Sequence, residues 1–259
     1  MSTSTVDLDV PVPMRDGAKL RANVFRPAGE GRHPVLLARL PYGKDLPRAT
    51  LVLDPVQAPR RGYAVVVQDT RGRFLSEGEF DPYRTEDVDG FDTIEWAAAQ
   101  PWSDGSVGMY GASYFGQTQW AAAKLQPAAL KAIAPYITWS DPADGTLSRG
   151  GALEFGLAVS WGLQMALNQL MRRHAADRPA MGQAIQEVIA DYDRLAATTY
   201  WDLPIRDFAP LSRHAAPNRI NLSLDAVAEP GLADHLRVRH DLVSIPSYNA
   251  GGWYDIFLQ

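Results

Sequence analysis

The chain opens with short stretches in which apolar and polar positions alternate, and it continues with unbroken apolar runs. The alternation over 6–12 and 19–25, with the turn pair 16–17 between them, predicts a β-hairpin. The runs over 34–40 and 62–67 have the length of a strand but show no alternation. Such runs are typical of strands that are buried on both faces, as in a parallel sheet.

Segments with apolar positions at helical spacing lie between and after these runs. The segment 85–99 predicts a helix, 107–110 a short strand, 114–125 a second helix and 130–137 a further strand. Strands that alternate with helices are the pattern of a parallel, doubly wound sheet. The predicted fold class is therefore α/β.

One long segment, 141–243, breaks this alternation of strands and helices. Its apolar positions recur at helical spacing over 153–171 and 181–195, which predicts two amphipathic helices. Strand-like sequence resumes only afterwards, at 244–250. We therefore expect a helical cap over the long segment, inserted into an α/β core. The core would comprise residues 1–140 and 244–259.

Composition narrows the classes of function. Hydrophobic residues make up 46% of the 259 residues and charged residues 21%, an ordinary globular balance that argues against wholesale disorder. The formal net charge of -5 disfavours a polyanion, so nucleic acid is not an expected partner. Without cysteine, disulfides, thiolate metal sites and a cysteine nucleophile are excluded. Neither a secretory signal nor an apolar stretch of ~20 residues is present, so we expect a cytoplasmic protein without a membrane partner.

A candidate nucleophile lies in the segment 107–116, which leads from a short apolar strand through a serine into a helix. This is the sequence context of a nucleophile elbow, where a serine occupies a sharp turn with its hydroxyl exposed above the sheet. Ser113 is the serine in that position. The helix that begins near Tyr114 would direct its N-terminal N–H groups at the site, so the backbone N–H of Tyr114 would serve as an oxyanion donor.

The spacing of the glycines departs from the generic elbow. That elbow reads G-x-S-x-G, whereas the second glycine here comes one position later, at Gly116, and Phe115 takes the usual small position. On spacing alone an alternative stays open, in which Ser113 merely caps a helix after a glycine-rich turn.

Several segments together resemble one family, the cocaine esterase-like (CocE/NonD) serine hydrolases. These are related to X-prolyl dipeptidyl peptidases and α-amino acid ester hydrolases, and the resemblance implies an α/β-hydrolase fold. The resemblance spans nearly the whole chain in the family's order, and the later glycine is the family's own form of the elbow. The matching segments are 39–45 (RLPYGKD), 68–80 (QDTRGRFLSEGEF), 108–116 (GMYGASYFG), 130–135 (LKAIAP) and 252–257 (GWYDIF).

The resemblance implies catalytic roles for four residues. Ser113 would be the nucleophile and Asp255 the acid of a catalytic triad. Tyr42 would donate its hydroxyl to the oxyanion hole, beside the backbone N–H of Tyr114. Structural alternatives stay open for two of them, because Tyr42 also suits a loop aromatic residue packed on the core and Asp255 a carboxylate at the end of a strand.

The resemblance also implies that the insertion covers an acyl pocket. Trp161 and Phe257 fall where the family places aromatic residues that line this pocket and bind substrate. Trp161 lies on an apolar helical stripe, so packing in the core is an equal alternative. Asp69 and Arg71 follow a predicted strand, where we expect them to form a structural ion pair rather than a catalytic one.

A serine nucleophile needs a general base. In α/β-hydrolases the triad follows the chain order Ser, Asp, His, so the histidine should follow Asp255. No histidine follows it, and the simplest interpretation is that the chain is truncated at its C-terminal end, before the final strand and the histidine. The 259 residues alone are then expected to be nearly inactive. The histidines present are His33, His174, His214, His235 and His240.

The function expected of the full-length parent is cleavage of a small-molecule ester or amide through an acyl-enzyme on Ser113, without a metal or organic cofactor. One alternative is an X-Pro dipeptidyl-peptidase or α-amino acid ester hydrolase-like activity. It would need anionic groups to hold the substrate ammonium, and Asp141, Asp144 and Glu154 are candidates to which the sequence assigns no role. Another is an inactive fragment that only binds a ligand.

Overall fold

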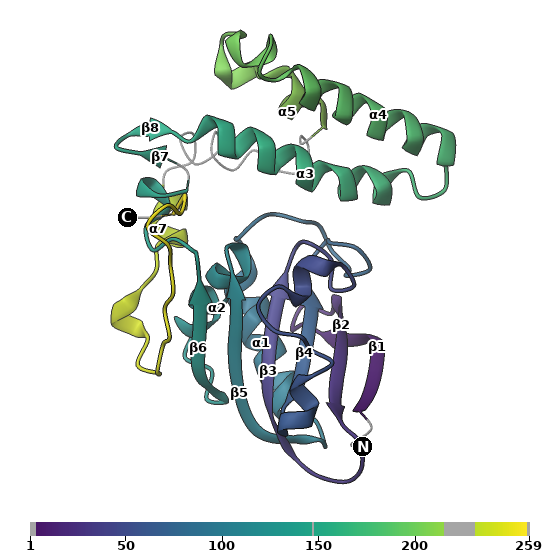
Figure 1. The fold of residues 1–259 in the computed structure, drawn as a ribbon, viewed down its shortest axis with the longest axis vertical. Helices are drawn as coiled ribbons and strands as arrows, with labels where there is room; N and C mark the ends of the chain where they lie inside the picture. The colour runs from purple at the N-terminus through teal and green to yellow at the C-terminus, as the bar shows by residue number, and fades with distance from the viewer. Residues whose placement is uncertain (1–3, 147, 215–230, 258–259) are drawn as a thin grey trace.

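The computed structural model describes residues 4–146, 148–214 and 231–257. A twisted sheet forms the base of the molecule, and a pair of long helices lies beyond one edge of it (Figure 1). The strands are β1 (Ser4–Pro13), β2 (Lys19–Pro27), β3 (His33–Leu40), β4 (Ala64–Asp69), β5 (Ser103–Ala112), β6 (Leu130–Tyr136), β7 (Ser148–Arg149) and β8 (Ala152–Leu153). The α-helices are α1 (Glu86–Ala98), α2 (Tyr114–Ala123), α3 (Phe155–Arg173), α4 (Arg178–Arg194), α5 (Ala209–His214) and α7 (Leu232–Leu236). The 3₁₀ helices are η1 (Pro47–Thr50), η2 (Ala58–Arg61), η3 (Pro142–Asp144), η4 (Thr199–Trp201), η5 (Ile205–Asp207) and η6 (His240–Leu242).

The main sheet has six strands in the order β1-β2-β4-β3-β5-β6. β1 and β2 form the predicted antiparallel hairpin, and β2 is also antiparallel to β4. From β4 through β3 and β5 to β6 every pair is parallel. The mostly parallel sheet with connecting helices confirms the predicted α/β fold. Among the described residues, no helix is long and apolar enough to cross a bilayer.

Both faces of the central strands are buried, as their unbroken apolar runs predict. All six residues of β4 are buried, and their side chains alternate between two clusters. Val65 and Val67 join a cluster that extends to η1, η2 and the helices of the cap. Ala64 and Val66 join a second cluster, which extends to α1 and α2. The strand therefore needs no polar face, because each side has its own hydrophobic cover.

The carboxyl ends of the parallel strands meet at one edge of the sheet, which is the edge nearest the long helices (Figure 1). Loops that follow β3, β4, β5 and β6 therefore converge there, which is where α/β sheets bind their ligands. The strand-like segment 244–250 runs beside β6 as two isolated parallel bridges, from Ser247 to Ile133 and from Ala250 to Tyr136. Backbone hydrogen bonds from Ala250 N–H to Pro135 O and from Ile137 N–H to Ala250 O hold its end near the same edge.

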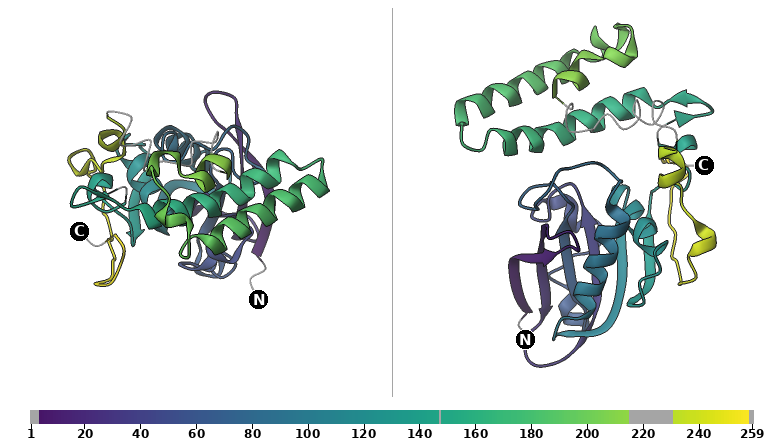
Figure 2. Two further views of the ribbon diagram at one scale, coloured as in Figure 1. Left: turned by 90° about the horizontal axis from the view of Figure 1, so that it is seen from above. Right: turned by 180° about the vertical axis from the view of Figure 1, so that it is seen from behind.

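The two predicted cap helices are present with shifted bounds. The helix predicted over 153–171 is α3 and the one predicted over 181–195 is α4, and the two lie side by side above the strand ends (Figure 2). α4 begins earlier than its apolar pattern indicates because Asp177 caps it. The Asp177 carboxylate accepts a hydrogen bond from the N–H of Ala180, and Pro179 lies in the first turn.

Opposite faces of α3 pack on different parts of the molecule. Successive residues of an α-helix are 100° apart, so Leu157, Trp161 and Gln164 lie on one side. These three residues line a cavity that also contains Ser113. The opposite side carries the fully buried Val159, Leu163 and Ala166 together with Leu170. α3 is thus covered on two sides, because this helix lies between the core and α4 (Figure 1).

Side-chain hydrogen bonds fix α3 to the loop that follows β4. The Nε2 of Gln169 donates to Gly72 O at 2.9 Å, and Asn168 accepts the N–H of Phe74 at 3.1 Å. The guanidinium of Arg172 donates to the carbonyls of Phe74 and Ser76. From the other side, buried Arg73 donates to Met165 O of the helix at 2.9 Å and to Pro41 O at 2.8 Å. The loop over 70–80 thus joins the cap to the end of β3.

The expected ion pair between Asp69 and Arg71 is not formed. Arg71 instead binds Asp89 at 2.6 Å and Asp16 at 2.8 Å, while Asp69 faces Lys44. The prediction was wrong because β4 ends at Asp69 and the chain turns from Arg71 onward, so the two side chains do not follow the geometry of one continuous strand. Both residues nevertheless take part in structural contacts, as expected.

Candidate active site

Ser113 occupies a strained turn between β5 and α2. Its backbone angles are φ 58° and ψ -123°, although a residue with a side chain rarely adopts positive φ. Such strain persists only where the surroundings enforce it, and it is concentrated at functional sites. The side chain stands at the carboxyl end of β5, immediately before the first turn of α2.

Hydrogen bonds to the loop after β6 hold this turn. The N–H of Ser113 donates to Tyr136 O at 3.0 Å and to Ile137 O at 2.9 Å. The hydroxyl of Thr138 donates to Ser113 O at 2.9 Å. A Cβ at Gly116 would lie 2.8 Å from Cβ of Thr138, so a side chain there would push the loop away. The displaced second glycine of the motif therefore has a packing role in this elbow.

Tyr42 lies just after β3, on the same edge of the sheet as Ser113. It packs edge-on against the rings of Tyr114 and Phe115, with ring centroids 6.4 and 6.3 Å apart. The indole N–H of Trp161 donates to its hydroxyl oxygen at 3.3 Å. Because the oxygen accepts this bond from the cap, the hydroxyl proton stays available for donation to another acceptor.

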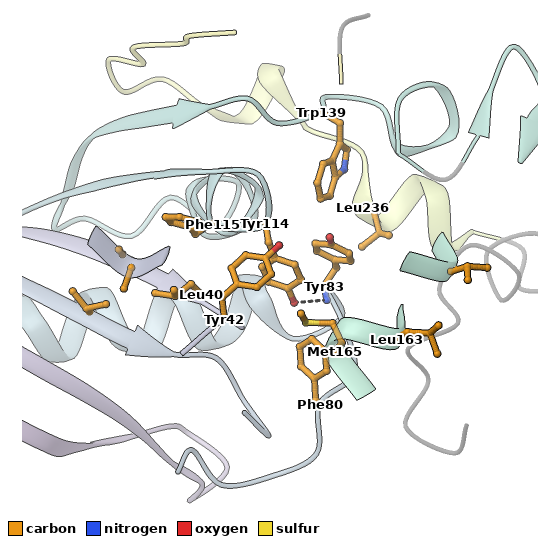
Figure 3. Packing of buried hydrophobic residues seen from close by; sticks show 14 of the residues in the cluster. Leu40, Tyr42, Phe80, Tyr83, Tyr114, Phe115, Trp139, Leu163, Met165 and Leu236 are labelled. Atoms are coloured by element: carbon orange, nitrogen blue, oxygen red, sulfur yellow. Dashed lines mark hydrogen bonds between the residues drawn. The ribbon is translucent and has the colours of Figure 1, made fainter. Parts of the chain in front are cut away.

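The side chain of Tyr114 is fully buried. Its hydroxyl donates to Glu86 at 2.8 Å. The hydroxyl oxygen also accepts the backbone N–H of Tyr83 at 3.0 Å (Figure 3). Burial, and secondarily the nearby Glu86 carboxylate, hold the pKa of Tyr114 well above its usual value. Glu86 is in turn paired with buried Arg39 at 2.9 Å. Tyr114 can therefore contribute only its backbone N–H to the active site. Because Tyr114 is the first residue of α2, this N–H has no acceptor within the helix.

A cavity of about 170 Å³ opens onto Ser113. It brings together Ser113, Tyr42, Trp161 and Phe257, four residues that the sequence analysis singles out from distant segments. Trp161 of α3 lines the cavity on the side of the long helices. Phe257, from the C-terminal segment, packs against Trp139 with ring centroids 5.3 Å apart. The lining residues are Tyr42, Arg48, Tyr83, Ser113, Trp139, Thr146, Leu157, Ala158, Ser160, Trp161, Gln164, Ile256 and Phe257.

Asp255 lines a neighbouring, more open cleft of about 500 Å³. Trp139 and Phe257 separate the two spaces, because both residues line both of them. One carboxylate oxygen of Asp255 accepts the N–H of Phe257 at 2.6 Å, which orients the carboxylate at the start of the turn. Asp255 therefore lies next to the Ser113 cavity without lining it.

All five histidines lie in the described part of the chain, and none lines the Ser113 cavity. His240 faces the cleft of Asp255 and packs edge-on against Trp120 at 5.2 Å. His214 is buried in the cap, 2.7 Å from Asp191, an arrangement that joins α5 to α4. Among the described residues, no group of three or more acidic or histidine side chains is arranged to hold a metal ion.

Nine of the thirteen lining residues are not singled out by the sequence, and the large side chains among them are those of Arg48, Tyr83 and Trp139. Tyr83 stacks on Tyr114 with ring centroids 4.2 Å apart, and Trp139 packs edge-on against Tyr83 at 5.1 Å. Trp139 follows β6 at the ligand-binding edge of the sheet, which is a signal that could have identified it. Arg48 and Tyr83 come from irregular loops, where hydrophobic periodicity gives no guidance.

A buried charge pair supports the loop that carries Tyr42. One oxygen of Asp69 accepts the N–H of Lys44 at 2.7 Å, and the other lies 3.7 Å from the Lys44 ammonium. Burial outweighs these contacts and raises the pKa of Asp69 to about 7. A raised pKa in the folded state favours the protonated form, so its stabilising contribution is present at low pH and lost as the pH rises through about 7.

We expect Asp69→Asn to become more stable relative to the parent as the pH rises from about 4 to 8. The amide can still accept the Lys44 N–H, but it avoids the cost of a buried negative charge. The difference should approach at most about 4 kcal/mol in the free energy of unfolding. Urea unfolding at several pH values measures it. A variant that instead loses stability at pH 8 would show that Lys44 fully compensates the charged carboxylate.

The fold and the nucleophile together define a class of protein. A strained serine at a strand-to-helix turn, above a mostly parallel sheet of this strand order, is the arrangement of an α/β-hydrolase. The sequence profile of the X-Pro dipeptidyl-peptidase (S15) family matches residues 16–259, and the chain belongs to this family.

Individual relatives agree with this assignment. The chain is 37% identical to the cocaine esterase of Rhodococcus sp. (strain MB1 Bresler) over 267 aligned positions, which cover 98% of this chain and 45% of that protein. A CocE/NonD family hydrolase from Staphylococcus aureus matches with a TM-score of 0.58 and 32% identity, over 70% of this chain and 36% of that chain. An aminopeptidase from a marine sediment Thaumarchaeota archaeon matches with a TM-score of 0.53 and 26% identity, over 63% of this chain and 30% of that chain. The chain thus spans less than half the length of each of these relatives.

Proposed function

We propose that the protein containing this chain is a serine hydrolase that cleaves an ester or amide acyl bond through an acyl-enzyme on Ser113. The observation that carries the proposal is the convergence at one cavity of a strained serine, the N-terminal end of α2 and the Tyr42 hydroxyl. Membership of the S15 family and the likeness to an enzyme named cocaine esterase support it.

The chemistry follows from these positions. The hydroxyl oxygen of Ser113 attacks the carbonyl carbon, and its proton passes to a general base. The oxyanion that forms accepts hydrogen bonds from the Tyr42 hydroxyl and the N–H of Tyr114, a pairing favoured by the position of both groups beside Ser113. The base then protonates the leaving group, and water releases the acyl group from Ser113.

The proposal assigns Asp255 to orient the base. Its place beside the cavity, after a segment that runs parallel to β6, is consistent with the acid of an α/β-hydrolase triad. None of the five histidines lines the cavity, so we propose that the base is a histidine from the part of the relatives' length that this chain does not span. Activity is accordingly proposed for the protein that includes such residues.

The dimensions of the cavity favour a small acyl group. Protein cavities of about 150 Å³ hold a ligand the size of benzene. The cavity of about 170 Å³ therefore accommodates an acyl chain of roughly six heavy atoms, between the Trp161 ring and the side chain of Phe257.

The aminopeptidase-like alternative finds less support in this cavity. Recognition of a substrate ammonium requires a nearby negative charge. No carboxylate occurs among the described residues that line the cavity, whereas Arg48 does. The acidic candidates are engaged elsewhere, since Asp141 pairs with Arg237 and Glu154 pairs with Arg149. We therefore favour an ester or acyl-amide substrate without a free ammonium group.

A fluorophosphonate probe tests the proposal in the full-length protein. We expect one covalent adduct, which peptide mass spectrometry should locate on Ser113. Ser113→Ala should abolish labelling, whereas Ser160→Ala is the matched control because Ser160 lines the same cavity without occupying the elbow. The proposal fails if the adduct forms on another residue or persists in Ser113→Ala.

A further inference from the structure

Arg48 brings an unpaired positive charge to the Ser113 cavity. It belongs to η1, and its guanidinium carbon lies 4.3 Å from the centroid of the Tyr42 ring. It is the one charged side chain among the described residues that line this cavity. Within the described ranges, no carboxylate lies within 4.0 Å of it, as an ion pair would require. The positive charge of Arg48 is therefore available to bind an anionic group of a ligand.

Stacking on Tyr42 gives this charge a defined position. A cation–π contact does not use the N–H groups of the guanidinium as donors to an acceptor oxygen, so these donors stay free. Those donors match the geometry of a carboxylate, which arginine binds through two parallel hydrogen bonds. Because stacking already restricts the side chain, a bound anion costs less side-chain entropy than it would at a free surface arginine.

The contact with Tyr42 also places the Arg48 guanidinium close to the carbonyl group that Ser113 attacks. Tyr42 supplies the hydroxyl assigned to the oxyanion, and Arg48 lies on the ring of that same side chain. A carboxylate held by Arg48 is thus only a short acyl chain away from the carbonyl that Ser113 attacks. The cavity volume of about 170 Å³ accepts an acyl chain of four or five carbons in total, counting the attacked carbonyl carbon and the carboxylate carbon.

We propose that Arg48 makes the cavity selective for acyl esters that carry a second, negatively charged carboxylate, such as half-esters of small dicarboxylic acids. This inference rests on the proposed function of Ser113 and names its substrate class. The opposite charge is disfavoured for the same reason, since a cationic acyl chain would meet a fixed positive charge without a carboxylate among the described lining residues.

Paired substrates measure this selectivity in the full-length protein. Mono-p-nitrophenyl glutarate carries the distal carboxylate, and p-nitrophenyl valerate has an acyl chain of the same carbon number without it. We expect Arg48→Gln to lower the ratio of their kcat/KM values about five- to tenfold, after correction for uncatalysed hydrolysis. Arg48→Glu should reverse the preference toward a p-nitrophenyl ester with a cationic chain. Because Arg48 is exposed, 0.5 M salt should reduce the effect of Arg48→Gln.

Arg60→Gln is the matched control, since Arg60 is an exposed arginine of the neighbouring η2 that does not line the cavity. A ratio that is equal in the parent and in Arg48→Gln overturns the inference while leaving the hydrolase function intact. If neither ester is hydrolysed, the proposed function fails instead. Calorimetric binding of monomethyl and dimethyl glutarate to Ser113→Ala then still decides the role of Arg48, which requires tighter binding of the monoanion and loss of that preference in Ser113→Ala/Arg48→Gln.

Discussion

Replacing Tyr42 with phenylalanine should slow acylation of Ser113 by about 10²- to 10³-fold, the usual cost of removing one oxyanion donor. The ring contacts with Tyr114 and Phe115 would remain, so the loss should appear in kcat with little change in KM. Stopped-flow measurement of p-nitrophenolate release in the full-length protein separates the two parameters.

Two further variants show whether the slower acylation in Tyr42→Phe is caused by the missing hydroxyl. Trp161→Phe removes the indole N–H that Tyr42 accepts but keeps an aromatic roof over the cavity. It should lower kcat about three- to tenfold, since the hydroxyl loses its fixed orientation without being removed. Tyr63→Phe is the control, because Tyr63 precedes β4 at the opposite edge of the sheet. An acylation rate in Tyr42→Phe within twofold of the parent would exclude Tyr42 as an oxyanion donor.

Replacing Gly72 with alanine should lower the free energy of unfolding by about 3 to 5 kcal/mol. Gly72 has φ +67°, and a Cβ there would lie 2.1 Å from the backbone nitrogen of Phe80 and 2.3 Å from the carbonyl carbon of Glu79. Neither contact can be relieved by rotating a side chain. The loop would have to open, and the anchoring bond from Gln169 to Gly72 O would be lost with it. Urea unfolding provides the measurement.

Gly62→Ala separates the steric cost from the conformational one. Gly62 also has a positive φ, of +84°, but a Cβ added there would meet no atom within 4 Å. This variant should lose only about 1 kcal/mol, the cost of left-handed backbone for a residue with a side chain. Equal losses in the two variants would mean that the loop over 70–80 adapts, and that its packing against Phe80 contributes little to stability.

Most of the fold could be predicted from hydrophobic patterning. Unbroken apolar runs identified β3 and β4 because both faces of these strands are buried, and helical spacing identified α1, α3 and α4. β5 is longer than the predicted strand 107–110, since it extends over Ser103–Ala112. Its outer residues pair with β3 and β6, and such pairing with neighbouring strands is invisible in the local pattern.

The segment 244–250 also shows that local sequence does not determine the pairing of a strand. Its pattern predicts a strand, yet the described residues form only two isolated bridges to β6. A strand is defined by the hydrogen bonds of its neighbours as well as by its own residues, and this segment pairs on one side alone in the described part of the chain. Prediction from composition cannot distinguish these two situations.

The residues of the candidate site that lie in sequence motifs could be predicted. Ser113 follows from the strand-serine-helix context, and Tyr42 and Phe257 from family motifs, and the structure brings these residues to one cavity. Arg48 and Tyr83 could not be found in this way, because they reach the cavity from loops without periodic patterns. Their positions depend on stacking with Tyr42 and Tyr114, which are contacts between distant parts of the sequence.

The two-sided packing of α3 has a consequence for protein engineering. Positions 157, 161 and 164 shape the pocket, while positions 159, 163, 166 and 170 on the reverse side hold the helical layer together. A library restricted to the first set would alter which substrates are accepted at small cost to folding. A library restricted to the second would change thermal tolerance while the chemistry stays the same. One helix thus offers selectivity and robustness as separately adjustable traits.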